Sequence, residues 1–441
     1  MCSRIYPDQR ASKLSMFIVI SSDALTASSL TSEPGRIARN LLLECVVIVS
    51  NLMNRINGIS NDDYQSMRSR IQHRVFYWGE DVQYPVPLPL ISPQMQETIC
   101  QQTHQTVREL KTLKLNTPVT FSSVSVGDKF VACLTAEGVL MTFGNGEHGS
   151  LGHGTFFDIL QPKIIEPLVS HCVIQICCGS QHMMALTDAQ KLFSWGKGTN
   201  GRLGLGNAET YTTPQLVSVP PDYKRIHYLS CSTDASAFVT TIGEVYCCGG
   251  NAYNKLGLAI SREDNIKNAC MFTRAKLLPQ VDISSHTTFS LGPTHTALIA
   301  QDQRLYTLGS NRYDQLGPHC DKFDSQYFVT EVSLPANSKQ PVKIQAGDTY
   351  TLAVTEGKSM NNIRLGLIFC ILFFYHCVWT WGRVGPKLGR TEDDGANPGL
   401  VCLSPGFTTM AVTSVCCFDG GTIIAVRGRD RARTSIDQSV N

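Results

Sequence analysis

The stretch CGSQHMMALTDAQKLFSWGKGTNGRLG, which runs from Cys178 to Gly204, decides the fold of this chain. It contains a β-prone apolar run, His182 to Thr187, then a short turn, then an alternating run from Lys191 to Trp195 that ends in a glycine. Two such runs joined by a turn predict an antiparallel pair of strands. The stretch therefore indicates β structure, and its glycine spacing can be used to search for further copies.

The same glycine spacing recurs along the chain. Three glycines separated by 17 and then 8 residues occur in three places, a fourth copy has serine at the first position, and a fifth has distorted spacing. A fixed period decides a fold before any single motif does. Successive second glycines lie 52, 53 and 60 residues apart from Gly144 to Gly309, which is enough for four short strands, or one propeller blade. The copies contain Gly127, Gly144 and Gly152; Gly179, Gly196 and Gly204; Ser232, Gly249 and Gly257; Gly292, Gly309 and Gly317; and Gly347, Gly382 and Gly389.

The composition argues against several classes of function. Hydrophobic residues make up 42% of the 441 residues, so the chain can bury a sizeable core. Because 38 basic residues face 36 acidic ones, the net charge of +2 gives no overall field for holding nucleic acid or an anionic membrane. The 17 cysteines include no Cys-x-x-Cys, which favours buried free thiols in a reducing compartment over zinc sites or disulfides. We expect no nucleic-acid or membrane partner.

Motifs that resemble ligand sites lack the context that those sites need. The runs Gly144–Gly149 and Gly196–Gly201 fit the dinucleotide-binding pattern, but a Leu-Gly signal follows each where that pattern requires a helix. Gly357-Lys358-Ser359 lacks the first glycine of a phosphate-binding loop, since Leu352 stands there. We therefore expect these glycines to form tight turns and the protein to hold no cofactor.

Two histidines and three tryptophans recur at fixed repeat positions. His182 and His295 share an offset at which other copies have Phe130, Ala235 or Tyr350, so a packing role is favoured over catalysis or metal binding. The tryptophans precede their glycines in a slot that other copies fill with Phe, Cys or Leu, and we expect them to wedge between blades. No catalytic constellation and no metal-ligand cluster stands out. These tryptophans are Trp78, Trp195 and Trp381.

The segments Cys178–His182, Ser194–Gly196 and Asn200–Gly204 resemble the repeat of the regulator of chromosome condensation family. The resemblance extends over roughly Val75 to Val426 and implies an all-β, seven-bladed β-propeller. Six blades can be counted. A propeller ring leaves no open sheet edge, so N- and C-terminal strands should complete one shared blade. The expected repeats lie near residues 124–173, 174–225, 226–285, 286–340 and 341–413, and the shared blade joins 75–79 with 414–427.

The propeller is expected to span residues 75–427. Residues 1–74 show no repeat. Within them, the apolar stretch Asn40–Met53 is either a docking helix or a poorly ordered leader. Residues 428–441 form a tail. Gly347 and Gly382 are 35 residues apart where the repeat requires 17, so residues 359–376 are interpreted as a foreign insertion of 18 residues from a retained intron or gene-model error. Its apolar run of 11 residues is too short to span a bilayer. The alternative is a genuine membrane-dipping or partner-binding loop.

A propeller without catalytic residues is a rigid disc whose loops bind partners. Gly250–Gly257 and Gly292–Ala297 are similar to blades of the propeller of NIMA-related protein kinases, in which it follows a kinase domain and regulates it. This implies a non-catalytic scaffold for protein–protein interaction in the cell cycle, located in the cytoplasm or the nucleus. The kinase motifs themselves are absent, so the chain would be a fragment of such a kinase or a stand-alone relative.

The alternative function is guanine-nucleotide exchange on a Ran-like small GTPase, the activity of the family's founding member. Such a factor needs a shaped surface and no catalytic side chain. The founder's basic tail has no counterpart here, since residues 1–20 contain only three basic residues.

The turn after each blade-closing glycine is expected to contribute to one basic rim. Equivalent turns of a propeller share one face, and two acidic residues, Glu147 and Asp314, stand among the bases. Such a rim would attract an acidic surface of a protein partner, either a kinase domain or a small GTPase. The alternative is a set of solvated loops without a partner. The candidate rim consists of Lys197, Arg202, Lys255, Arg312, Arg383 and Lys387.

Overall fold

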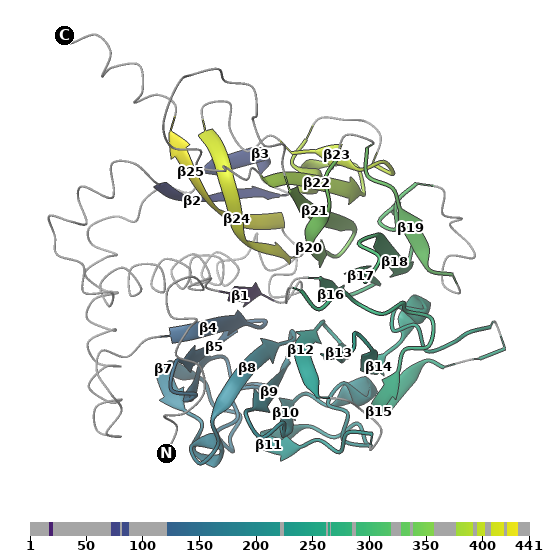
Figure 1. The fold of residues 1–441 in the computed structure, drawn as a ribbon. Helices are drawn as coiled ribbons and strands as arrows, with labels where there is room; N and C mark the ends of the chain where they lie inside the picture. The colour runs from purple at the N-terminus through teal and green to yellow at the C-terminus, as the bar shows by residue number, and fades with distance from the viewer. Residues whose placement is uncertain are drawn as a thin grey trace, which may run out of the picture.

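Each repeat forms one antiparallel sheet in the computed structural model, and we number these sheets as blades 1 to 5 (Figure 1). Within each blade the strands follow one another in chain order, so the four strands of one repeat hydrogen-bond to each other and form one blade. The predicted all-β architecture is confirmed. The structure describes residues 17–20, 72–79, 82–87, 121–220, 225–261, 263–264, 266–284, 288–318, 328–335, 338–356, 376–390, 395–401, 407–418 and 421–430.

The second and third strands of blade 2 match the two runs expected from the sequence, His182 to Thr187 and Lys191 to Trp195, and the other internal blades repeat the same four-strand order. Blade 1 contains β4 (Phe121–Val126), β5 (Phe130–Thr135), β6 (Leu140–Gly144) and β7 (Ile159–Ile164). Blade 2 contains β8 (Val173–Cys178), β9 (His182–Thr187), β10 (Leu192–Gly196) and β11 (Tyr211–Leu216). Blade 3 contains β12 (Ile226–Cys231), β13 (Ala235–Thr240), β14 (Val245–Gly250) and β15 (Asn268–Arg274). Blade 4 contains β16 (Phe289–Leu291), β17 (His295–Ile299), β18 (Leu305–Gly309) and β19 (Thr330–Val332). Blade 5 contains β20 (Pro341–Ala346), β21 (Tyr350–Glu356), β22 (His376–Gly382) and β23 (Gly399–Leu400).

The two ends of the chain together build blade 6. Its strand order is β24, β25, β2, β3, and β2 pairs antiparallel with β25 from Gln72 opposite Gly428 to Gly79 opposite Gly421. The expected closure by N- and C-terminal strands is confirmed, and the described residues contain six blades, as counted from the sequence. The bounds are β2 (Gln72–Gly79), β3 (Val82–Pro87), β24 (Phe407–Phe418) and β25 (Gly421–Asp430).

A further short strand, β1 (Phe17–Ile20), joins blade 1. It pairs parallel with β4, from Phe17 opposite Ser123 to Ile20 opposite Val126, and lies between blades 1 and 6 in Figure 1. A run of four residues without a repeat counterpart gave no signal for this pairing in the sequence.

The 8-residue step between the second and third glycines forms a turn that folds back onto the third strand of its own blade. In blade 2, the Ser194 hydroxyl donates a hydrogen bond to the carbonyl of Leu203 at 2.7 Å. The next residue, Gly204, has a φ of 69°, a left-handed conformation that favours glycine. Equivalent bonds join Thr142 to Leu151, Thr307 to Leu316 and Thr380 to Leu388 at 2.6 to 2.8 Å.

The first glycine of a repeat lies where neighbouring blades approach each other. A Cβ added to Gly179 would lie 2.6 Å from the carbonyl oxygen of Ser232 in blade 3. It would also overlap the ring of His182, which starts the second strand of the same blade. In this copy the position therefore requires a residue without a side chain.

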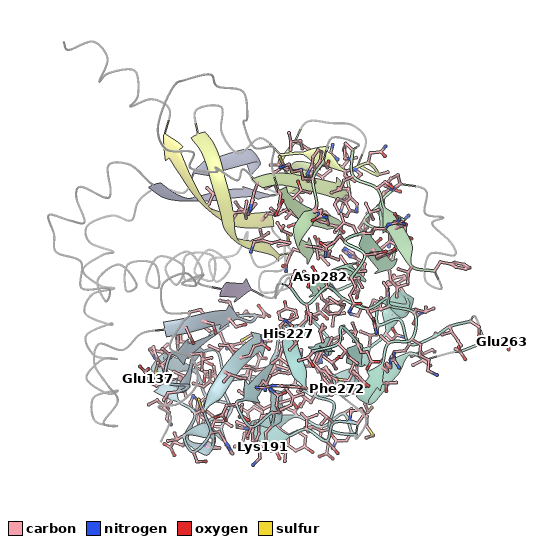
Figure 2. The ribbon with its side chains drawn as sticks, viewed as in Figure 1. Glu137, Lys191, His227, Glu263, Phe272 and Asp282 are labelled. Atoms are coloured by element: carbon pink, nitrogen blue, oxygen red, sulfur yellow. The ribbon has the colours of Figure 1, made fainter. Side chains whose placement is uncertain are left out.

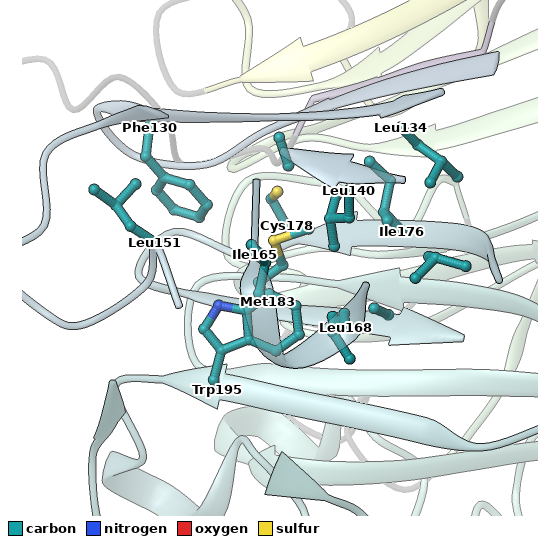
Figure 3. Close-up of a cluster of buried hydrophobic side chains, with 13 residues drawn as sticks. Phe130, Leu134, Leu140, Leu151, Ile165, Leu168, Ile176, Cys178, Met183 and Trp195 are labelled. Atoms are coloured by element: carbon teal, nitrogen blue, oxygen red, sulfur yellow. The ribbon is translucent and has the colours of Figure 1, made fainter. Parts of the chain in front are cut away.

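The hydrophobic core lies between adjacent blades. In Figure 3, Phe130 and Leu140 of blade 1 pack in one cluster with Ile176, Met183 and Trp195 of blade 2. Trp195 is fully buried, and its indole N–H donates to the carbonyl of Ser150 in blade 1 at 2.9 Å. Trp381 is fully buried as well, so both tryptophans are wedges as expected; the side chain of Trp78 lies outside the described residues.

Strand register places an excess of chain in the hairpin of blade 5. In blade 1 the last pair of the second and third strands is Leu134 with Leu140. The equivalent pair in blade 5 is Val354 with Val378, so 18 more residues separate the two strands. Of the expected insertion 359–376, all but His376 lies outside the described residues. His376 belongs to β22, and its Nδ1 accepts a hydrogen bond from the backbone N–H of Val412 at 2.9 Å.

Candidate partner-binding face

One end of each internal blade carries two loops that lie against each other, and we call this end the turn face. In blade 2, the N–H of Lys197, just after the third-strand glycine, donates to the carbonyl of Gln181 before the second strand. Lys191, labelled in Figure 2, lies at the opposite end of the blade, where its carbonyl accepts from Thr187. The turns that contain the six candidate bases therefore occupy equivalent blade ends. The same bond joins Asn145 to Lys129, Gly250 to Asp234, Ser310 to Thr294 and Arg383 to Thr349 at 2.8 to 3.0 Å.

Lys255 does not lie on the surface of the turn face. Its side chain is 0% exposed, and its ammonium group lies 2.5 Å from a carboxylate oxygen of Asp234 in the same blade. It also donates to the carbonyl of Pro293 in blade 4 at 2.6 Å. The prediction of Lys255 as a rim residue is wrong, because this lysine connects two blades from the inside.

Arg202 is the second base that the structure removes from the rim. The residue is only 5% exposed, and its guanidinium donates to the carbonyls of Thr199 in its own turn and Thr233 in blade 3 at 3.0 and 2.7 Å. Its placement on an exposed rim is therefore also wrong. The side chain is used to hold blades 2 and 3 together.

Lys387 is largely covered and engaged. Its ammonium group forms an ion pair of 2.8 Å with Asp348 in the same blade, and its side chain is 12% exposed. Lys387, Arg202 and Lys255 share one repeat position, directly before the Leu-Gly pair. A sequence signal for their burial exists, because that position precedes a buried leucine and is filled by Ser150 and Gln315 in the other blades.

The other three candidate bases remain accessible. Lys197 is half-buried, and Arg312 and Arg383 are exposed. The guanidinium carbons of Arg312 and Arg383 lie 5.5 and 5.0 Å from the ring centre of Tyr313. The structure thus brings two bases from blades 4 and 5 to one tyrosine, which we call the Arg–Tyr cluster; Tyr313 was not identified from the sequence.

The recurring histidines are buried contacts between blades. His182 is hydrogen-bonded to the Ser236 hydroxyl, and His295 to the Thr351 hydroxyl, at 2.8 Å each. Burial, with the nearby charge of Lys255, lowers the pKa of His295 to about 3. Burial also lowers the pKa of His182 well below its usual value. Both rings are therefore neutral at physiological pH and belong to the core, as the sequence indicated.

The cysteines of the core are free thiols. Cys177, Cys178, Cys247 and Cys248 are buried and unbonded to another sulfur. Burial raises the pKa of the Cys178 and Cys248 thiols well above the usual value, so neither is an activated nucleophile. The residues that the structure describes contain no group of three or more potential metal ligands and no helix suited to crossing a membrane.

Comparison with family models identifies the repeat. Residues 137–186 and 191–239 match the regulator of chromosome condensation (RCC1) repeat, and a second model of this repeat matches residues 173–202. The chain is therefore a β-propeller of RCC1 repeats. A solved structure, that of human WBSCR16, shares the fold with a TM-score of 0.53 and 16% sequence identity, over 78% of this chain and 76% of that one.

Several curated relatives are serine/threonine-protein kinases. The chain is 34% identical over 318 residues to serine/threonine-protein kinase Nek8 of Danio rerio, which covers 70% of this chain and 42% of the kinase. It is 31% identical over 315 residues to Nek9 of Xenopus laevis, covering 69% of this chain and 31% of that kinase. The chain thus spans less than half the length of either relative.

Proposed function

We propose that this propeller is a non-catalytic scaffold that binds a protein kinase domain and regulates it. The observation that carries the proposal is the 34% identity to Nek8 over 318 residues, a span that must include most of the propeller. A similar propeller thus accompanies a kinase in a curated relative. The kinase domain is supplied either by a longer form of this polypeptide or by a second chain, in the cytoplasm or the nucleus and within the cell cycle.

The architecture supports binding rather than chemistry. Side chains form hydrogen bonds from blade to blade across blades 1 to 5, as with Trp195, Lys255 and His295, and tie the loops of the turn face to a packed core. Its loops are then displayed on a fixed frame, which lowers the ordering cost of binding a partner. In the described residues the buried histidines and thiols are unsuited to proton transfer or nucleophilic attack.

Calorimetry with the purified chain and an isolated NIMA-related kinase domain tests this proposal. We expect a saturable complex and a change in kcat of the kinase on a peptide substrate, with the human WBSCR16 propeller as a control for the fold alone. Absence of binding, or equal binding by the control propeller, would contradict it. GDP release from Ran is measured in parallel: acceleration by this chain would favour the exchange-factor hypothesis instead.

A further inference from the structure

Two arginines of the turn face are exposed. Arg312 follows β18 in blade 4, and Arg383 follows β22 in blade 5. Within the described part of the chain neither guanidinium forms an ion pair or a hydrogen bond. Their contact is with the ring of Tyr313, at 5.5 and 5.0 Å.

Nearby carboxylates on this face are already engaged. Asp348, in the loop before β21, pairs with Lys387 at 2.8 Å. Asp234, in the corresponding loop of blade 3, pairs with the buried Lys255. These two carboxylates are therefore paired with lysines rather than with Arg312 or Arg383, and the blade 4 turn itself contains one acidic residue, Asp314, next to Tyr313.

The tyrosine ring prepares both arginines for binding. A guanidinium over an aromatic face is attracted to the ring and loses part of its rotamer freedom before a ligand arrives. Each guanidinium still exposes a fork of N–H donors, which can bind a carboxylate through two parallel hydrogen bonds. Two positive charges near one ring repel each other, so an anion that reaches both relieves that repulsion.

An aromatic residue extends the same surface into blade 3. Tyr253, in the turn η3 (Ala252–Asn254), occupies the repeat position that Tyr313 occupies in blade 4. It is 49% exposed and has a φ of 57°, a conformation that is costly for a bulky side chain. Exposed tyrosine and arginine are the residue types most enriched at the centres of protein interfaces.

We propose that the Arg–Tyr cluster is the docking site for an acidic, glutamate- or aspartate-rich peptide segment of a partner protein. The carboxylates of the segment bind the two guanidiniums, and its neighbouring residues lie along the face toward Tyr253. This inference goes beyond the scaffold function, because it names a surface and its ligand chemistry whichever protein supplies the segment.

Fluorescence anisotropy with the full chain tests the site. The probe is a fluorescein-labelled peptide in which glutamate alternates with glycine, and its glutamine counterpart is the neutral control. The double variant R312A/R383A should weaken binding of the glutamate peptide at least about tenfold, and the affinity of the wild type should fall as salt rises. R312K/R383K keeps the charge but loses the fork and should bind with intermediate affinity.

The matched control removes the same charge from the other end of the strands. Arg225 and Lys276 are exposed, and Arg225 lies beside the hairpin end of β13, where its carbonyl accepts from Thr241. The variant R225A/K276A should bind the peptide like the wild type. Equal losses in both double variants would refute the site, as would tighter binding of a phosphoserine peptide or of single-stranded DNA than of the glutamate peptide. Because the anisotropy assay contains no kinase, its result does not depend on whether the scaffold proposal holds.

Discussion

The buried ion pair between Lys255 and Asp234 should respond unequally to loss of its two partners. The ammonium is fully buried, whereas the Asp234 side chain is 24% exposed and remains partly hydrated. D234N leaves a buried charge with the carbonyl of Pro293 and a neutral amide as its remaining acceptors. Removal of one partner of a buried pair costs about 3 to 5 kcal/mol, and the residual amide places D234N near 3 kcal/mol.

K255M should cost less than D234N. It fills a similar volume, leaves no buried cation, and exposes a carboxylate that water can reach. The remaining losses are the Pro293 hydrogen bond and the unpaired Asp234, for which about 1 to 2 kcal/mol is expected.

Urea unfolding followed by circular dichroism measures both free energies, and comparison of midpoints at equal slope avoids a long extrapolation. D234N should unfold at a clearly lower urea concentration than K255M. Equal midpoints, or a lower midpoint for K255M, would refute the argument that the lysine is the desolvated partner.

Three further predictions follow from the same structure. G204A should lower the free energy of urea unfolding by about 2 to 4 kcal/mol, since its Cβ would lie 2.4 Å from the Phe272 ring. G206A has the same left-handed strain, but the nearest neighbour of its Cβ is 4.0 Å away, so it should cost about 1 kcal/mol. Similar costs for the two variants would contradict the steric account. The pKa of His295 is about 3 in the folded chain and near 6.5 in the unfolded chain, so the unfolded chain binds more protons between these values and stability should fall as pH drops below 6.5. H295F should flatten this dependence of the free energy of unfolding on pH, and an unchanged slope would contradict the prediction. Asp128, whose pKa is about 6, acts in the opposite direction. Deletion of the 18 residues 358–375, which keeps His376 in β22, restores the standard spacing of the blade 5 hairpin. It should stabilise the chain by about 1 kcal/mol through a shorter closing loop. Loss of the cooperative unfolding transition would instead show that the extra residues belong to the fold.

The glycine repeat predicted the architecture because it reflects local geometry that recurs from blade to blade, as in the turn bonds of blades 1, 2, 4 and 5. Gly179 avoids a clash with the next blade, and the bond from Ser194 to Leu203 fixes the 8-residue step. Counting these steps predicted six blades and the shared closing blade. Register also agrees with the 18-residue excess in blade 5, while its origin as a foreign insertion remains a proposal.

The candidate rim was predicted less well, because the charge of a residue does not show whether its side chain points to solvent or between the blades. Lys255 and Arg202 precede the Leu-Gly pair and point between blades, where backbone carbonyls of the next blade accept their hydrogen bonds. Tyr313 could not be identified because its role depends on Arg383, which is 70 residues away in sequence. The parallel pairing of β1 with β4 was missed for a similar reason, since a single short strand has no period.

A circular permutant tests the closed ring most directly. The last strand, β25, ends at Asp430 beside the start of β2, with Gly428 opposite Gln72. A chain that runs from residue 120 to 430, continues through a short glycine linker, and ends with residues 71–88 should therefore form blade 6 as a continuous hairpin. Its urea midpoint is compared with that of the linear chain 71–430. Closure by both ends predicts one cooperative transition at an equal or higher midpoint, and an unfolded or aggregated permutant beside a folded linear chain would contradict it.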